Sequence, residues 1–265
     1  MPNIFLENIS FEYEDGTKAL NDINLSIAPA SKVAILGQNG AGKTSMVKLM
    51  NGLLRPSKGR VLLDDLDCKD YSTAKLSKKV SYVFQNPDDQ IFHNKVIDEL
   101  SFGPRNLGFS EDKVASLCQM ALELCDLEKY KDENPYNLPY SLRKFVALAC
   151  VLAMDCPILI LDEPTAGQDK KGLDTLGKVL RELENMQKTV IVITHDMEFA
   201  AQHFSRIIVM ANSKIISDTD AASTFRNEEI MKQARLKLPA FALLARELKL
   251  DESIIKKAEL LKALL

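Results

Sequence analysis

The sequence lacks a hydrophobic stretch long enough to span a membrane. Its longest run free of charge and strong polarity, from Phe145 to Met154, ends at Asp155 and falls short of the roughly 18 apolar residues that a bilayer span needs. At the start of the sequence no basic residue precedes Lys18 and no long apolar core follows, so no secretory signal is predicted. We therefore expect a chain that stays in the cytoplasm and does not cross a membrane by itself.

Paired cysteines and an excess of either charge are also missing. The five cysteines include no C-x-x-C pair, which argues against a disulfide framework and against a thiolate metal cage. We expect buried or idle thiols at Cys68, Cys118, Cys125, Cys150 and Cys156. The 34 basic and 37 acidic side chains give a net charge of −3, so the sequence predicts no global attraction to nucleic acid.

The composition, 46% hydrophobic and 27% charged over 265 residues, is typical of a globular protein with one large domain or two small ones. Residues 3–13 and 19–27 have half-buried strand patterns joined by a turn, which favours an antiparallel layer. Residues 32–36 form a compact apolar run that ends in a glycine-rich loop, and residues 45–54 then show helical spacing.

The middle of the sequence has a helical pattern, and strand patterns resume after it. The pattern over residues 95–153 is mostly helical. A second helix is predicted from about residue 141 to 154. Before it, one helix face is formed by Val114, Leu117, Cys118, Ala121, Leu122 and Cys125. The short apolar runs 158–161 and 190–193 are flanked by helical segments, as parallel central strands are. We therefore predict an α/β core that is split by a helical insertion.

From about residue 221 the pattern predicts a further helical tail. Its apolar positions, which would line one stripe, are Leu243, Leu244, Leu248, Ile254, Ile255, Ala258, Leu261 and Leu265. Such a stripe either packs on its own domain or contacts a partner, and the sequence leaves both open.

A phosphate-binding motif follows the apolar run 32–36. The segment Gly37, Gln38, Asn39, Gly40, Ala41, Gly42, Lys43 and Thr44 satisfies G-x-x-x-x-G-K-[ST], directly after a predicted strand and before a predicted helix. Backbone N–H groups of such a loop and the helix N-terminus attract phosphate. We expect Lys43 to bridge the β- and γ-phosphates, Thr44 to bind Mg²⁺ and Ser45 to donate to a phosphate oxygen. The alternative is a strand-to-helix turn without a ligand.

Two adjacent carboxylates, Asp162 and Glu163, end the apolar run 158–161, at the sheet edge where ligands collect in open α/β sheets. We expect Asp162 to hold Mg²⁺ and Glu163 to act as the general base for the attacking water. The alternative is that they only cap the turn at Pro164 and Thr165. His195 follows the strand pattern 189–194 and would reach the same edge, where an imidazole can contact the γ-phosphate.

Together these residues resemble the nucleotide-binding subunit of an ATP-binding cassette (ABC) transporter, with its Walker A loop, Walker B strand and switch histidine in order. The resemblance implies that Gln85 is the Q-loop residue that touches Mg²⁺ and water, and that Tyr13 stacks on adenine. It also implies that Asp169 belongs to the D-loop at the dimer interface, although Gln168 stands where leucine is usual.

The fold implied by this resemblance is a P-loop (RecA-like) ABC ATPase core. It would comprise a nucleotide-binding domain over residues 1–220, with an N-terminal antiparallel β layer and a helical subdomain inserted at about 95–155, and a helical C-terminal extension over residues 221–265. ATP and Mg²⁺ are the cofactors that such a domain uses.

The segments 84–92, 102–108 and 194–201 are similar to the ATPase subunits of energy-coupling-factor importers, which power uptake of vitamins, cobalt or nickel. The resemblance implies a second ATPase subunit, a transmembrane coupling protein, a separate substrate-binding membrane protein and a peripheral place on the cytoplasmic face of the membrane. Asp88 and Asp89, after the Q-loop, would receive basic residues of the coupling protein, and a solvated turn is the alternative.

The family's signature, Leu-Ser-Gly-Gly-Gln, is replaced by Leu138, Pro139, Tyr140, Ser141 and Leu142. In the family this segment grips the γ-phosphate of the partner's ATP through backbone N–H groups at a helix N-terminus. Pro139 has no N–H and Tyr140 adds bulk, so only Ser141 is left as a helix cap and donor. We therefore expect slow hydrolysis by a homodimer, and a heterodimer with a signature-competent partner as the physiological form.

Two other functions compete with transport-coupled ATP hydrolysis. A non-transport ABC ATPase of translation or DNA repair would be expected to carry two cassettes or a long coiled-coil insertion, which these 265 residues do not contain. A nucleotide-gated regulatory subunit with little turnover is favoured by the altered signature, whereas Glu163 and His195 argue for a working site.

Overall fold

The computed structural model describes residues 3–251 and 254–264. The chain divides into two compact units, each with its own contacts. The first, called the helical unit, consists of Ala28–Ser31 and Asp70–Val190. The second, called the strand-rich unit, consists of Asn3–Ile27, Lys32–Lys69 and Ile191 onward.

The strand-rich unit begins with an antiparallel sheet of order β2-β1-β4-β5. Its strands are β1 (Ile4–Glu12), β2 (Lys18–Ile27), β4 (Lys58–Leu63) and β5 (Leu66–Asp67). Alternate residues of β1 are buried, which is the pattern of a strand with one covered face. The predicted antiparallel N-terminal layer is therefore confirmed, because β1 pairs antiparallel with β2.

A second set of strands in this unit carries the phosphate-binding motif. In it β10 (Lys214–Asp220), β9 (Arg206–Ala211), β3 (Lys32–Leu36) and the part of β8 (Thr189–Ile193) from Ile191 onward are neighbours in that order. The apolar run 32–36 forms β3 as predicted, parallel to β9. Helix α1 (Lys43–Met50) follows the loop, and the predicted end at residue 54 is wrong, because Gly52, with φ of 74°, breaks the helical conformation.

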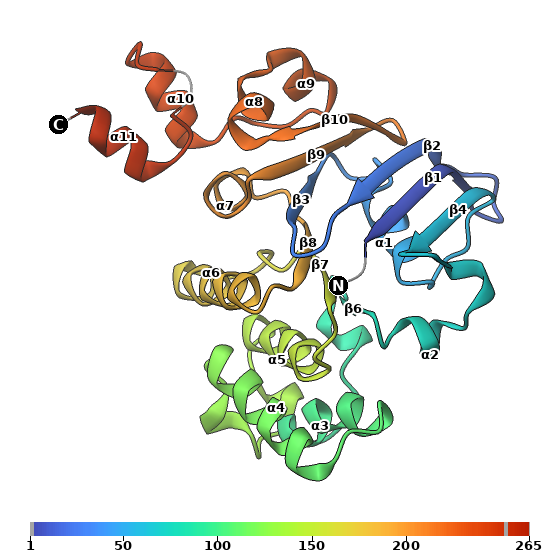
Figure 1. The fold of residues 1–265 in the computed structure, drawn as a ribbon. Helices are drawn as coiled ribbons and strands as arrows, with labels where there is room; N and C mark the ends of the chain where they lie inside the picture. Colours follow the sequence, from blue (N-terminus) through green and yellow to red (C-terminus); the bar gives the residue numbers. More distant parts are fainter. Residues whose placement is uncertain (1–2, 252–253, 265) are drawn as a thin grey trace. The chain divides into compact units, whose positions relative to one another are not determined.

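Short helices complete the strand-rich unit (Figure 1). They are α7 (Met197–His203), α8 (Ala221–Arg226), α9 (Glu228–Gln233), α10 (Ala240–Glu247) and α11 (Lys257–Leu264). The C-terminal tail is helical as predicted, but of the described positions in its predicted apolar stripe only Ile254 and Ile255 are buried. Leu243, Leu244, Leu248, Ala258 and Leu261 are exposed, whereas Ala245, Ile254 and Leu260 form a small core, and Leu265 lies outside the described residues. The apolar pattern of the sequence continues between α10 and α11, where the helix is interrupted, so the predicted positions do not form one continuous face.

In the helical unit, α3 (Val96–Asn106), α4 (Glu111–Leu124) and α5 (Tyr140–Ala153) pack on one another, as the green segments of Figure 1 show. Within the predicted face of α4, Val114, Cys118, Ala121 and Leu122 are buried. The unit also contains α2 (Thr73–Leu76), β6 (Val80–Val83), β7 (Ile158–Asp162), α6 (Lys170–Asn185) and three 3-10 helices over Pro87–Asp89, Glu128–Tyr130 and Pro135–Asn137.

The strand β7 was predicted from its apolar run, and all five of its residues are buried. It pairs in parallel with β6, as expected of a central strand. No helix in the described part of the chain is both long and apolar enough to cross a bilayer. The domain boundaries at residues 95, 155 and 220 stay predictions.

Candidate nucleotide-binding site

The predicted phosphate-binding loop connects β3 to α1 in the strand-rich unit. Gly37 has φ of 151° and Gly42 has φ of 98°. A Cβ atom at either position would lie 2.3 Å from a backbone oxygen, that of Met210 at Gly37 and that of Ala19 at Gly42. Glycine is required at both positions because only glycine tolerates this conformation and this close approach. Gly42 is the N-cap of α1, so the loop ends on a helix N-terminus as predicted.

The lysine of the loop is folded against the loop's own backbone. Lys43 is only 7% exposed. Its Nζ atom donates hydrogen bonds to the carbonyl oxygens of Gly37 at 2.8 Å and Gln38 at 3.0 Å. An ammonium and a helix N-terminus thus occupy one short segment, which is an arrangement that binds anions such as phosphate. Of the other predicted loop residues, Ala41 and Ser45 are buried, Gln38 and Thr44 are half-buried, and Asn39 and Gly40 are exposed.

Tyr13, one residue beyond β1, lies beside this loop. The hydroxyls of Tyr13 and Ser45 are 2.9 Å apart and hydrogen-bonded. The Tyr13 ring meets the Phe11 ring edge to face at 4.8 Å, and the side chain is 40% exposed. The fold therefore brings the predicted adenine-stacking residue to the loop. The contact between an adenine and Tyr13, and that between a phosphate and Ser45, stay predictions.

His195 follows β8, which is the neighbour of β3. The backbone N–H of Thr194 donates to the carbonyl oxygen of Ile35 at 3.3 Å, so the two strands end side by side. His195 is exposed, and next to it Asp196 caps α7 by accepting from the N–H of Phe199 at 2.9 Å. The predicted histidine thus lies at the same edge as the phosphate-binding loop.

The two predicted carboxylates lie in the helical unit, at the end of β7. Asp162 is 1% exposed and Glu163 is 6% exposed. In the parallel pairing of β6 with β7, Val83 lies opposite Leu161. Gln85 and Glu163 each follow these paired residues by two positions, so both leave the same edge of the strand pair. The structure therefore brings Gln85, which is exposed, to the carboxylate end of β7.

A residue that the sequence analysis missed, Tyr82, contacts one of these carboxylates. Its hydroxyl donates to Oδ2 of Asp162 at 2.6 Å. Burial raises the pKa of Tyr82, and the neighbouring charge of Asp162 raises it further, so the phenol remains a donor. The strand β6 was not predicted, because its four residues are too short a run to show a period. If β6 had been predicted, its parallel pairing with β7 would have indicated that Tyr82 lies near Asp162.

The segment in the signature position starts α5. Pro139 occupies the N-cap position without a side-chain cap, and Tyr140 is the first helical residue. The predicted capping role of Ser141 is wrong, since Ser141 lies inside the first turn. Leu138 is buried and Leu142 is half-buried.

The D-loop position Asp169 caps a helix in the same unit. Its carboxylate accepts from the N–H of Gly172 at 2.8 Å, at the start of α6. Asp88 forms an ion pair with Arg143 at 3.0 Å, and the carboxylate of Asp89 accepts from the Asn86 amide at 3.2 Å. Both acidic side chains after the Q-loop therefore have partners within their own chain. Their predicted roles toward other subunits stay predictions.

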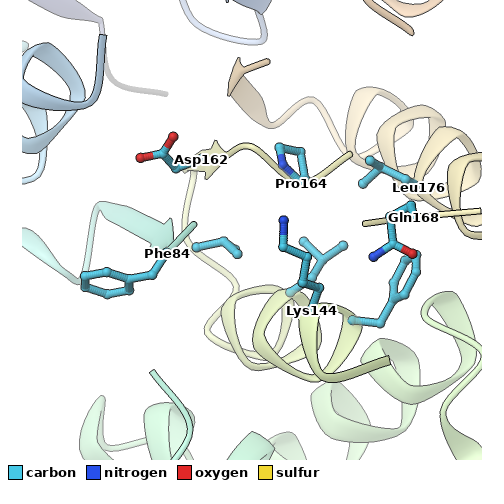
Figure 2. Close-up of a pocket in the computed structure, with 9 residues that line it drawn as sticks. Phe84, Lys144, Asp162, Pro164, Gln168 and Leu176 are labelled. Atoms are coloured by element: carbon cyan, nitrogen blue, oxygen red, sulfur yellow. The ribbon is translucent and has the colours of Figure 1, made fainter. Parts of the chain in front are cut away.

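A pocket of the helical unit lies at the end of β7 (Figure 2). Asp162, Gln168, Phe84 and Lys144 are among its lining residues. Figure 2 shows the Lys144 side chain extending from α5 toward the loop that carries Pro164. Lys144 was not singled out from the sequence, although a single lysine in front of the apolar run 145–154 is a signal that could have found it.

Comparison with known proteins identifies the family. A family model described as ABC transporter matches residues 20–166, more than half of the chain. A putative ABC transporter ATP-binding protein from Methanosarcina acetivorans is 43% identical over 248 residues, which cover 94% of this chain and 40% of that relative. The energy-coupling factor transporter ATP-binding protein EcfA from Methanothermobacter thermautotrophicus is 38% identical over 250 residues. The matched region covers 93% of this chain and 80% of EcfA.

A solved structure is similar over nearly the same span. The structure of cbiO1 from Clostridium perfringens, which is part of the ABC transporter complex cbiONQ, has a TM-score of 0.77 and 34% identity. The match covers 93% of this chain and 98% of that one.

The chain therefore belongs to the ABC transporter family of ATP-binding cassettes. Its fold is the mixed α/β P-loop fold of these cassettes, a family whose members bind and hydrolyse ATP. The predicted fold class, family and ATPase class are confirmed. The roles of the individual site residues stay predictions.

Proposed function

We propose that this chain is the ATP-hydrolysing subunit of an energy-coupling-factor type importer that takes up a vitamin or a transition-metal ion such as cobalt or nickel. The extent of the likeness to cbiO1 carries the proposal. The match with cbiO1 covers 93% of this chain, so about 7% of the chain lies outside it. Residues 221–265 make up a larger share than this, so the likeness extends into the C-terminal extension.

The proposed assembly has four kinds of component. Besides this chain it contains a second ABC ATPase subunit, a transmembrane coupling protein and a separate membrane protein that binds the transported solute. This chain would lie on the cytoplasmic face of the membrane as a peripheral subunit.

In the strand-rich unit, the loop would bind the triphosphate. The N–H groups at the start of α1 and the Lys43 ammonium would hold the β- and γ-phosphates, because both present positive charge to the anion. The Tyr13 ring, on the edge of the same loop, would stack on adenine.

The residues predicted to bind Mg²⁺ all supply oxygen. They are the Asp162 carboxylate, the Gln85 amide and the Thr44 hydroxyl, and oxygen ligands of this kind are those that Mg²⁺ prefers. When bound, the ion would neutralise negative charge on the β- and γ-phosphate oxygens.

Hydrolysis needs a base and a positioned water. Glu163 would accept a proton from water as the water oxygen bonds to the γ-phosphorus. The bond from that phosphorus to the oxygen shared with the β-phosphate breaks, which leaves ADP and inorganic phosphate. His195 would contact the γ-phosphate and help to hold the water in place.

The first test is Glu163→Gln, which keeps the shape of the side chain and removes its basicity. We expect this variant to retain bound ATP and to hydrolyse it at least about a hundredfold more slowly, since general bases contribute roughly 10²–10⁴ to rate. Retained nucleotide after gel filtration and single-turnover hydrolysis measure the two effects. Unchanged release and hydrolysis would remove Glu163 from the catalytic role.

A second candidate function is a nucleotide-gated regulatory subunit with little turnover, and Pro139 at the start of α5 favours it. ATP turnover of the chain alone, and after co-expression with a second ATPase subunit and a coupling protein, separates the two. Activity only in the assembly supports one competent site in a heterodimer. Strong activity of the chain alone would show that the altered signature works, and no activity in either form would support the regulatory subunit.

A further inference from the structure

A buried lysine of the helical unit contacts the predicted general base. Lys144 lies on α5 and is only 6% exposed. Its Nζ atom donates a hydrogen bond to the backbone carbonyl oxygen of Glu163. Burial lowers the pKa of Lys144, while the charges of Glu163 and Asp162 act in the opposite direction. A buried ammonium needs a hydrogen-bond acceptor, so this contact fixes the position of the Lys144 ammonium group.

The backbone of Glu163 has an unusual conformation. Its φ is 51°, in the left-handed region that non-glycine residues rarely adopt. Such a conformation persists only where surrounding contacts hold it. The carbonyl oxygen of Glu163 accepts from Lys144 and also from the N–H of Ala166 at 3.3 Å. The lysine is therefore one of the groups that fix this turn, and the turn sets the direction of the Glu163 side chain.

The far end of the same loop is also attached to α5. The Gln168 amide donates to the carbonyl oxygen of Ser141 at 3.1 Å. A Cβ atom at Gly167 would lie 3.4 Å from two atoms of the Tyr140 ring. Gln168 and Tyr140 are two of the departures from the family pattern, and both lie at this contact. The start of α5 thus packs against the loop that follows β7 in its own chain.

We propose that Lys144 is a positioning residue for Glu163, whose ammonium holds the left-handed turn that directs the Glu163 carboxylate toward the attacking water. This proposal rests on the catalytic role proposed for Glu163. Lys144 acts on the chemical step through the backbone of Glu163.

The test compares kcat and KM for ATP in the full chain, together with whichever partners give the wild type its activity. Lys144→Met should lower kcat about tenfold or more, a fraction of the 10²–10⁴ that a general base contributes, and leave KM within about twofold. Lys144→Arg should restore most of kcat, because its guanidinium still donates to the carbonyl. Lys178→Met, on the exposed side of α6, is the control and should keep the wild-type rate.

A double variant separates positioning from general destabilisation. If Lys144 acts only through Glu163, adding Lys144→Met to Glu163→Gln should cause no further loss of kcat. If Lys144→Met does not fold, Lys144→Gln takes its place, since the amide fills the space without the ammonium.

The outcomes distinguish this proposal from the proposed function. A slow Glu163→Gln together with Lys144→Met at the wild-type rate would overturn only the role of Lys144. A loss of the same size in both backgrounds would also overturn it, because Lys144 would then act independently of Glu163. Equal rates for the wild type and Glu163→Gln would overturn both proposals.

Discussion

The starts of α1 and α5 are two versions of the same local structure, a helix N-terminus preceded by an irregular segment. Helix α1 begins after Gly42, whose φ of 98° leads the backbone into the helix from a loop in which Asn39 and Gly40 are exposed. Helix α5 begins after Pro139, which has φ of −54° and no N–H, and the Tyr140 ring lies against Gly167. The first is suited to an anion. At the second, the Tyr140 ring and the Ser141 carbonyl oxygen contact the loop after β7 in their own chain.

This difference shows that a helix N-terminus is a phosphate site only when the residues before it leave its N–H groups accessible. At α1 the helix follows Gly42, which has no side chain, and the exposed Asn39 and Gly40. At α5 a proline removes one donor and an aromatic ring adds bulk. Two of the residues at α5 that differ from the family's signature, Tyr140 and Ser141, also contact the loop that carries Glu163 and Gln168.

The largest effect is expected from breaking the start of α1 with Gly42→Ala. A Cβ atom there would lie 2.3 Å from the carbonyl oxygen of Ala19, and the backbone has a positive φ. Strain of roughly 3 kcal/mol from these two sources would lower ATP affinity about a hundredfold. Titration with a fluorescent ATP analogue measures it. Gly16→Ala, with φ of 84° and no atom within 4 Å, is the control, and wild-type affinity for Gly42→Ala would contradict the expectation.

The second largest effect is expected when the start of α5 is made to resemble a functional signature. The double change Pro139→Ser and Tyr140→Gly restores a backbone donor and removes the ring. Since one such donor is worth about 10²–10³ in rate, we expect ATP turnover of the chain alone to rise by some tens of fold. Tyr140→Phe keeps the bulk and should show no gain. An unchanged rate for the double variant would mean that the signature segment does not limit hydrolysis.

A smaller effect is expected at Asp162, which lies in the same unit as α5. Tyr82→Phe removes the hydrogen bond to Oδ2, so the carboxylate loses the contact that orients it. Loss of such an outer partner typically costs about tenfold or more in metal affinity, so the Mg²⁺ concentration for half-maximal ATPase activity should rise about tenfold. Tyr130→Phe, whose ring contacts Lys129, is the control. An unchanged Mg²⁺ requirement would show that Tyr82 does not orient Asp162.

The smallest effect concerns the stability of the two units rather than either helix start. Burial raises the pKa of Cys68, in the strand-rich unit, and of Cys156, in the helical unit, from 9.0 to about 11. Below pH 9 these protonated thiols make their full contribution to the free energy of unfolding. That contribution is lost as the pH rises from 9 to 11, because the thiols of the unfolded state lose their protons at lower pH than those of the folded state. Denaturant unfolding between pH 8 and 11 measures this loss.

The same thiols report separately on the two units. Because little thiolate exists at pH 8, both should react slowly with a disulfide reagent in the folded chain. Cys68→Ser and Cys156→Ser variants assign each reaction to one unit. Fast reaction of both thiols at pH 8 would contradict the raised pKa values.

The parts of the site that sequence reasoning found are short contiguous motifs. The loop 37–44 and the acidic end of β7 were predicted because their residue types, order and flanking apolar runs lie within a few positions of each other. Partners that are distant in the sequence were missed. Tyr82 meets Asp162 across 80 positions, and Lys144 meets the Glu163 backbone across 19.

Two predictions failed for a related reason. The helix expected to reach residue 54 ends at Met50, and the apolar stripe of the C-terminal tail is interrupted between α10 and α11. In both cases the periodicity of side chains continued past a point where the backbone turns. Periodicity records which residues are apolar, but it does not record where a helix stops.

Local residue types and their spacing were enough to predict the phosphate-binding loop, the order of strand, loop and helix around it, and the family. The tertiary structure decided which distant side chains support them. It placed Tyr13 on Ser45, Tyr82 on Asp162 and the start of α5 on its own chain's loop. These contacts depend on strand pairing and helix packing, and such long-range pairings leave no fixed spacing in the sequence.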